Sequence, residues 1–120
     1  MKFTIELPEP PSANRWWRKW KNRMVLSEEA RGYKAYVFLM AVARTSLNAK
    51  RLPLFPTQPI AVTVTWYRGR KSGDLDKRLG VVLDALQGAL YKNDGQVVRL
   101  VAEREDRPGK PGLLVTVEDL

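Results

Sequence analysis

Hydrophobic and polar side chains alternate along four stretches of the chain. These stretches are "KFTIEL" (2–7), "IAVTVTWY" (60–67), "VVRLVAERE" (97–105) and "GLLVTVED" (112–119). Alternation places successive side chains on opposite faces of an extended chain, so it predicts four β-strands. The last two stretches are joined by "DRPGKP", which is typical of a hairpin loop.

Two other stretches carry helical signals. Ser27 is a suitable N-cap, and Glu28 and Glu29 would stabilise the first turn of a helix that continues to about Lys50. A second helix is expected from Asp74 or Leu75 through "LDKRLGVVLDALQGALY". Its apolar side chains recur at helical spacing on one face: Leu75, Leu79, Val82, Leu83, Leu86 and Leu90.

The remaining segments are predicted to be connections. Prolines break "PEPPSANRWWRKWKNR" (8–23) and "RLPLFPTQP" (51–59), and "KNDGQ" (92–96) has the composition of a turn. The predicted order is therefore β-α-β-α-β-β. A strand, a helix and a strand in succession favour a crossover in a mixed sheet, within one α/β domain spanning residues 1–120.

The charge balance narrows the range of partners. The 120 residues include 21 Lys and Arg against 13 Asp and Glu, for a formal charge of +8. A basic chain of this size suits a polyanion, because Lys and Arg release counterions when they neutralise phosphates. Nucleic acid is favoured over the alternative, a protein that is merely basic.

The chain contains neither Cys nor His. This composition excludes disulfides, zinc sites built on thiolate or imidazole, and nucleophilic catalysis by Ser-His-Asp or Cys-His groups. No apolar run approaches the length of a membrane span, and the N-terminus does not read as a signal peptide. A cytoplasmic protein without a membrane association is expected.

Four aspartates lie between residues 74 and 94. Asp74 and Asp76 fall where a strand gives way to a helix, a place where ligand groups often gather, although both could simply cap that helix. Asp84 lies about 12 Å further along the helix and points away, so a solvated position or a local salt bridge is expected for it. Whether Asp94 approaches Asp74 depends on loop folding or on a neighbouring chain.

If Asp74, Asp76 and Asp94 converge, they form a hard oxygen site that suits Mg²⁺ or Mn²⁺. Such an ion can polarise a phosphoryl group and generate hydroxide at neutral pH without a histidine. Phosphates would then be held by the neighbouring cations: Arg68, Arg70 and Lys71.

The segment "NRWWRKWKNR" (14–23) interleaves three tryptophans with five cations, among them Arg15, Arg18 and Lys19. Indoles and cations together suit stacking on unpaired bases combined with phosphate contacts. The alternative is that the tryptophans anchor a loop on the core, and at least one is expected to be buried.

Two motifs are similar to those of the RusA family of Holliday junction resolvases: the opening "LPEPPSANRWWR" and the core "GDLDKRLGVVLDALQGALYKNDGQVV". The resemblance spans nearly the whole chain. It implies a small α/β homodimer that requires Mg²⁺ and nicks four-way DNA junctions symmetrically. It also implies that Asp74, Asp76 and Asp94 are the catalytic, metal-binding aspartates.

The chain departs from the family pattern at several positions. Gly80 stands where the family has a functional lysine, Lys77 replaces the usual Asn after DLD, and Asn93 replaces the first residue of a usual DD pair. Lys77 is the first candidate to supply the missing ammonium, with Arg78 and Lys92 as alternatives; Lys77 and Arg78 are also expected to contact DNA. Two rival readings stay open: a basic module that binds branched or single-stranded DNA without cutting it, and a protein-interaction subunit.

Overall fold

The computed structural model describes residues 1–45 and 51–120. Its centre is a four-stranded sheet in the order β1 (Lys2–Leu7), β6 (Gly112–Asp119), β4 (Ile60–Arg68) and β5 (Val97–Asp106). Strand β6 is antiparallel to both of its neighbours, whereas β4 and β5 are parallel. The predicted single α/β domain with a mixed sheet is therefore confirmed.

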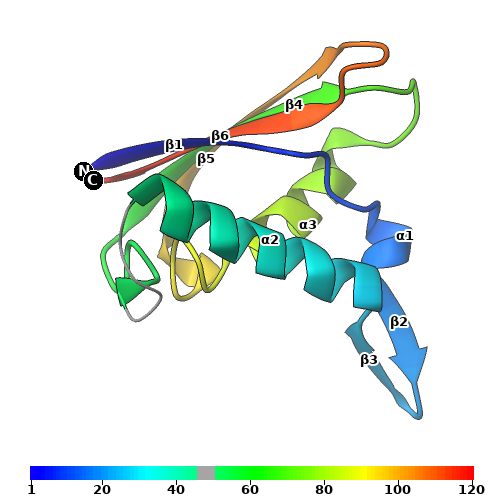
Figure 1. The fold of residues 1–120 in the computed structure, drawn as a ribbon, viewed down its shortest axis with the longest axis horizontal. Coiled ribbons are helices and arrows are strands. Elements are labelled where there is room, and N and C mark those ends of the chain that lie inside the picture. The colour runs from blue at the N-terminus through cyan, green and yellow to red at the C-terminus, as the bar shows by residue number, and fades with distance from the viewer. Residues whose placement is uncertain (46–50) are drawn as a thin grey trace.

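Two long helices, α2 (Glu28–Thr45) and α3 (Leu75–Leu86), lie on one side of this sheet (Figure 1). The predicted start of α2 is confirmed, because the Ala30 amide donates to Ser27 Oγ at 3.0 Å. The final part of the predicted extension to Lys50 lies outside the described residues. Between the sheet and the helices, Val62 and Val64 of β4 pack with Val82 and other apolar side chains of α3 in one buried core.

The β4–α3–β5 unit is the predicted crossover. Helix α3 begins just beyond the carboxyl end of β4, and the chain then returns to start β5 beside the beginning of β4. The 12 residues of α3 span about 18 Å at about 1.5 Å per residue. Helix α3 therefore covers part of the return, and residues 87–96 complete it to the start of β5.

The predicted β5–β6 hairpin is wrong, because β4 lies between these two strands. Their connection passes over the end of β4, where the Arg107 amide donates to the Arg68 carbonyl at 2.9 Å. Alternation identifies a strand but does not identify its neighbour.

The predicted end of the second helix near Tyr91 is also wrong, because α3 ends at Leu86. Gln87 is already extended, and Gly88 has φ +98°, a left-handed conformation that glycine adopts without steric cost. The apolar periodicity continues past the helix because the following turn is itself buried: Tyr91 is fully covered and its hydroxyl donates to the Leu83 carbonyl at 2.5 Å.

The predicted loop at residues 8–23 contains regular structure. A short helix α1 (Ala13–Trp16) leads into a hairpin of β2 (Trp17–Trp20) and β3 (Arg23–Leu26), and this hairpin projects from the body of the molecule (Figure 1). Both of its faces are largely exposed, so no apolar alternation marks it. Among the described residues, no helix is long and apolar enough to cross a membrane.

Candidate active site

The proline-rich segment 8–12 is held against the body by side chains from three elements. The Tyr33 hydroxyl of α2 donates to the Pro8 carbonyl at 2.6 Å. The Trp66 indole of β4 donates to the Glu9 carboxylate at 2.8 Å. These bonds place the residues that follow the prolines beside the start of α3.

Arg78 of α3 supplies the third tie. Its guanidinium donates to the Pro10 carbonyl at 2.5 Å and stacks over the Trp66 ring at 4.5 Å from the centroid. Burial lowers the pKa of Arg78, and the nearby Glu9 carboxylate opposes that shift. This predicted DNA-binding residue is thus engaged within the chain, where it clamps the N-terminal segment to α3.

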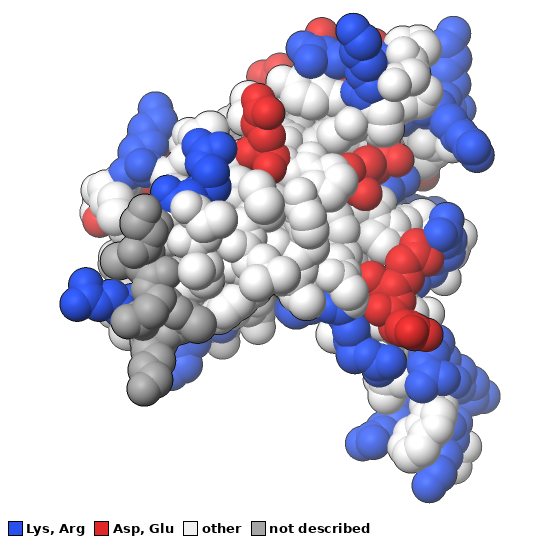
Figure 2. All heavy atoms as spheres, viewed as in Figure 1, with Lys and Arg blue, Asp and Glu red and all other residues white. Residues whose placement is uncertain are grey.

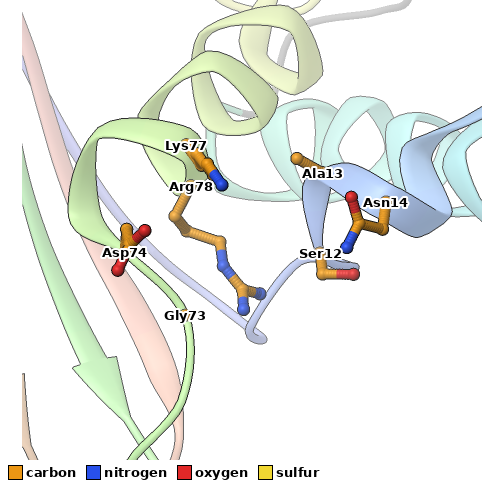
Figure 3. A pocket seen from close by; sticks show the side chains of 7 residues that line it. All are labelled: Ser12, Ala13, Asn14, Gly73, Asp74, Lys77 and Arg78. Carbon is orange, nitrogen blue, oxygen red and sulfur yellow. The ribbon is translucent and has the colours of Figure 1, made fainter.

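The clamped segment and the start of α3 enclose a hollow of about 190 Å³ (Figure 3). Figure 3 shows Lys77 and Arg78 reaching from the helix toward the segment that carries Ser12 and Asn14. The residues lining the hollow are Ser12, Ala13, Asn14, Gly73, Asp74, Lys77 and Arg78. Ser12 and Asn14 were not predicted as site residues, and the "PPSAN" motif is the signal that could have identified them.

Asp74 occupies the N-cap position of α3, but its carboxylate makes no capping hydrogen bond. Only its backbone carbonyl takes part, accepting from the Arg78 amide at 3.1 Å. Asp76 lies in the first turn, and both aspartates are exposed. The capping alternative therefore does not account for Asp74, and two carboxylates remain available to a ligand at the start of α3.

Asp94 lies at the other end of α3. It opens the short 3-10 helix η2 (Asp94–Gln96), which leads directly into β5. Within residues 1–45 and 51–120, no three acidic side chains lie close enough together to hold one metal ion. A single chain does not bring Asp94 to Asp74 and Asp76, because the length of α3 separates them.

The turn that carries Asp94 is fixed by Gln96. Its side-chain oxygen accepts from the Lys92 and Asn93 amides, both at 2.9 Å. Its side-chain nitrogen donates to the carbonyls of Phe55 and Gln58 at 2.9 and 3.0 Å. Sequence reasoning treated this segment only as a turn and missed the amide that anchors it.

Asp84 is engaged in contacts of its own, apart from the carboxylates of Asp74, Asp76 and Asp94. Its carboxylate accepts from the Trp16 indole at 2.8 Å and lies 3.9 Å from the Lys34 ammonium. Of the two expectations for Asp84, the salt bridge is confirmed, but its partner belongs to α2 and is not local in the sequence. Trp16 is fully buried, as expected for at least one tryptophan of the segment, whereas Trp17 and Trp20 are exposed.

The predicted DNA-binding cations differ in the contacts that they make within the chain. Arg15 forms a two-pronged ion pair with Glu29, with its closest contact at 2.6 Å. The remaining candidates, apart from Arg68 and Arg78, are exposed and form no salt bridge with the described residues: Arg18, Lys19, Arg70, Lys71 and Lys77. Figure 2 shows Lys and Arg along the projecting hairpin and again around the sheet end where the β4–α3 and β5–β6 connections meet.

Arg68 braces the connection between β4 and α3. Its guanidinium donates to the Asp106 carboxylate at 2.8 Å and to the Gly73 carbonyl at 3.2 Å. The hydrogen bond from Arg68 is the main reason why the pKa of Asp106 lies below its ordinary value. Arg68 therefore positions the residue that precedes Asp74.

On the projecting hairpin, Trp20 is in contact with two cations. The Lys21 ammonium is 4.5 Å and the Arg23 guanidinium 5.4 Å from its ring centroid. An exposed indole with flanking cations is the combination that binds unpaired bases and their phosphates.

Gly80, at the position where the family carries a lysine, has room for a side chain. Gly80 is exposed on α3, and a Cβ atom there would have no atom within 4 Å apart from those of its chain neighbours and of the backbone of its own helix. Lys77 shares a hollow with Asp74, whereas Lys92 lies beyond the far end of α3. Arg78 lines the same hollow but is engaged by the Pro10 carbonyl and the Trp66 ring, so Lys77 is the better candidate for the missing ammonium.

The sequence is similar to one family over almost its whole length. The family model described as "Endodeoxyribonuclease RusA" matches residues 8–118. Relatives from Escherichia coli strains K12, CFT073 and UTI89 are each named "Crossover junction endodeoxyribonuclease RusA". Each is 31% identical over 118 residues, which cover 95% of this chain and 93% of the relative.

Proposed function

The chain belongs to the RusA family, and from this membership we propose that it is a DNA endonuclease that resolves four-way (Holliday) junctions by paired symmetric nicks. The observation that carries the proposal is the pair of exposed carboxylates, Asp74 and Asp76, beside a basic hollow. The Asp74 carboxylate is not used to cap its own helix. These groups occupy the positions of the DLD motif by which the sequence resembles the family.

The donor set fits a hard divalent cation, Mg²⁺ or Mn²⁺. Asp74, Asp76 and Asp94 offer carboxylate oxygens, and the chain has no Cys or His that would favour zinc. When bound, such an ion would supply a water of lowered pKa and stabilise charge on the phosphate. Two of the three carboxylates come from one end of α3, and Asp94 must come from elsewhere.

The side chains around the carboxylates would hold the substrate. Lys77 projects into the hollow beside Asp74, where its ammonium would neutralise a non-bridging phosphate oxygen (Figure 3). Ser12 and Asn14, on the opposite wall, offer hydrogen bonds that would orient the same phosphate or its neighbour.

The exposed cations would contact DNA on both sides of this centre. Arg70 and Lys71 lie in the connection that leads to Asp74, and Arg18 and Lys19 lie on the projecting hairpin. Trp20 at the hairpin tip would stack on a base exposed at the branch point, because a junction offers unpaired or distorted bases.

The active form would be a homodimer. Paired nicks at symmetric positions of a four-way junction require two identical centres related by a two-fold axis. Family membership supports this assembly, and the separation of Asp94 from Asp74 gives an independent reason to expect a second copy.

The test is incubation of the purified protein with a synthetic mobile four-way junction, in Mg²⁺ and in EDTA. Wild-type protein should produce symmetric nicks in Mg²⁺ alone. Asp76→Asn should abolish them while retaining junction binding in a gel-shift assay. Glu6→Gln is the matched control: it removes the charge of an exposed carboxylate on β1 and should leave nicking intact.

Junction binding without nicks in either Mg²⁺ or Mn²⁺ would contradict the proposal. That result would favour the DNA-binding module, for which Gly80 in place of the family lysine is the supporting observation. Weak binding that responds little to salt would instead favour a protein-interaction subunit, because contacts to phosphates are strongly salt-dependent.

A further inference from the structure

Arg78 is the point at which three separate segments of the chain meet. Its guanidinium, which reaches out from α3, donates to the Pro10 carbonyl at 2.5 Å and lies 4.5 Å from the centroid of the Trp66 ring on β4. Its backbone amide donates to the Asp74 carbonyl at 3.1 Å. One residue thus ties the N-terminal segment and β4 to the first turn of α3, where the DLD motif lies.

Trp66 links this contact to the Glu9 carboxylate. The ring is fully buried, and its indole N–H donates to the carboxylate at 2.8 Å. The ring therefore has the Arg78 cation on its face and an anion at its polar edge, which matches the negative face and positive edge of an aromatic ring. The ring cannot turn without losing one of these two contacts, so together they hold it in one orientation.

Gly73 is packed against the same two side chains. A Cβ atom on this residue would lie 3.2 Å from Trp66 Cη2 and 3.3 Å from Arg78 Nη2, closer than side chains ordinarily approach. Its φ of +93° is a second reason for glycine at this position. Arg68 donates to its carbonyl at 3.2 Å. The residue that immediately precedes Asp74 is therefore fixed in place.

These contacts reach both walls of the hollow. On one wall, Arg78 directly follows Lys77 and is packed against Gly73. On the other wall, Pro10 lies two residues before Ser12. Figure 3 shows the Arg78 guanidinium between Gly73 and the segment that carries Ser12. The separation of the two walls is thus set by one guanidinium and the ring beneath it.

We propose that Glu9, Trp66 and Arg78 act together as positioning residues, which fix the two walls of the hollow relative to each other and so place a phosphate between Lys77 and Asn14. The identity of the bound phosphate rests on the proposed function, whereas the contacts that fix the walls do not. The sequence predicts a DNA contact for Arg78, but its contacts in the folded chain give it a role between the walls.

The arrangement calls for a guanidinium in particular. A guanidinium is planar, so it can stack on an indole while its N–H groups point outward to an acceptor such as the Pro10 carbonyl. A lysine ammonium keeps the charge but lacks the plane and the fork of donors. Substitution of Arg78 therefore separates charge from geometry: Arg78→Lys changes the geometry alone, and Arg78→Gln changes both.

Nicking and binding should respond differently to these substitutions. A displacement of about 1 Å in a reaction centre can cost about a hundredfold in rate. Single-turnover nicking should therefore fall about a hundredfold in both Arg78→Lys and Arg78→Gln. Junction affinity should change by less than about threefold, because no phosphate contact is lost. Arg44→Gln is the matched control: this exposed arginine of α2 donates to the Thr4 carbonyl at 3.4 Å, and its loss should leave the rate unchanged.

The salt dependence of binding separates a positioning role from a phosphate contact. Loss of one phosphate contact lowers the slope of log affinity against log salt by about 1. The slope should be unchanged in Arg78→Gln. It should fall by about 1 in Arg70→Gln, which removes an exposed cation of the connection before α3. A lower slope in Arg78→Gln, or full nicking by Arg78→Lys, would overturn the positioning role.

Trp66 and Glu9 test the same unit from its other members. Trp66→Phe keeps a ring beneath Arg78 but loses the indole N–H, and Glu9→Ala removes the acceptor of that N–H. Nicking should fall about tenfold in each, because the ring is no longer held in one orientation. Glu9→Gln keeps an acceptor oxygen and should lose less. The double variant should be no slower than the slower single variant, since both changes remove one shared hydrogen bond.

A distance measurement tests the positioning without DNA or metal. The chain has no cysteine, so Ser12→Cys and Gly80→Cys can carry a pair of nitroxide labels. Excess unlabelled protein limits the measurement to pairs within one chain. Pulsed EPR should give a narrow distance distribution that broadens when Arg78→Gln is added. Glu9→Ala, which changes only a half-buried side chain, should broaden the distribution in the same way.

A second label pair serves as the control. Leu39→Cys with Gly80→Cys measures the distance between α2 and α3, and this distribution should stay the same in every variant. A Ser12–Gly80 distribution that is unchanged in both Arg78→Gln and Glu9→Ala would overturn the positioning role.

The outcomes distinguish the two proposals. A wild-type protein that never nicks junctions would refute the endonuclease, and the label distances would still decide whether Arg78 and Glu9 fix the walls. Wild-type nicking that persists at full rate in Arg78→Lys and Glu9→Ala would overturn the positioning role and leave the endonuclease standing.

Discussion

The Trp16 indole donates a 2.8 Å hydrogen bond to Asp84, across 68 residues of sequence. This bond joins the base of the projecting hairpin to the last turn of α3, the helix that carries Asp74 and Asp76 at its start. Trp16 is fully buried and packs edge-on against Tyr33 at 6.1 Å between ring centroids. The base of the hairpin is therefore held against the end of α3 that lies away from Asp74 and Asp76.

Removing this contact should destabilise the protein. Asp84→Ala leaves the buried indole N–H without an acceptor and should lower the free energy of unfolding by about 1–3 kcal/mol. Thermal and urea denaturation measure the loss. Asp84→Asn keeps an acceptor oxygen and should lose less than half as much. Equal losses in both variants would show that the charge of Asp84, rather than its hydrogen bond, matters.

Gly80 offers a test by addition of a side chain. Gly80→Ala should stabilise the protein by about 0.5–1 kcal/mol, because glycine is unfavourable inside a helix and the position has room. Gly80→Lys should give a similar gain in stability and, in addition, raise the rate of junction nicking. Alanine is the control that separates these effects. An unchanged nicking rate for the lysine variant would indicate that Lys77 already supplies the ammonium.

The hairpin tip should contribute to DNA affinity. Trp20→Ala should weaken junction binding by about 1–3 kcal/mol, the cost of losing one stacked base. Fluorescence anisotropy with a labelled junction measures the change at constant salt. Leu39→Ala, which removes an exposed apolar side chain from α2, is the control and should bind normally. A Trp20→Ala variant with full affinity would remove the hairpin tip from the DNA surface.

Gln96 should matter for activity through Asp94. Gln96→Ala removes four hydrogen bonds from the turn that carries Asp94, so nicking should fall while junction affinity is kept. Gln96→Glu keeps the acceptor oxygens but loses the donors to Phe55 and Gln58. Single-turnover nicking and gel-shift assays should rank the variants as wild type, Glu and then Ala.

The Arg68–Asp106 pair should make stability depend on pH in the acid range. The pKa of Asp106 is lower in the folded protein than in the unfolded chain. Its contribution is therefore fully present above about pH 4 and is lost as the pH falls through the lowered folded value. Asp106→Asn should be less stable than wild type near neutral pH, and this difference should shrink toward about pH 2. Thermal melts across the range measure it, and a constant difference would contradict the pairing.

The sequence by itself determined the four strands of the central sheet, the two long helices and the location of the DLD motif. These features follow from alternation, helical spacing and capping, which depend on residues near each other in the chain. The sequence also identified the family, because the DLD motif before α3 and the "NDGQVV" motif after it are separated by the number of residues that is typical of the family. The N-cap at Ser27 and the separation of Asp84 from Asp76 could also be predicted, because both depend only on residues that are close in the sequence.

Only the tertiary structure decided which distant groups meet. Strand order separated β5 from β6, and the hairpin at residues 17–26 was invisible because exposed strands carry no apolar alternation. Packing between elements places the Arg78 guanidinium over the Trp66 ring. It also leaves the Asp74 carboxylate without a capping hydrogen bond to its own helix and brings Asn14 beside it. Each outcome depends on packing between elements, and local spacing carries no information about that packing.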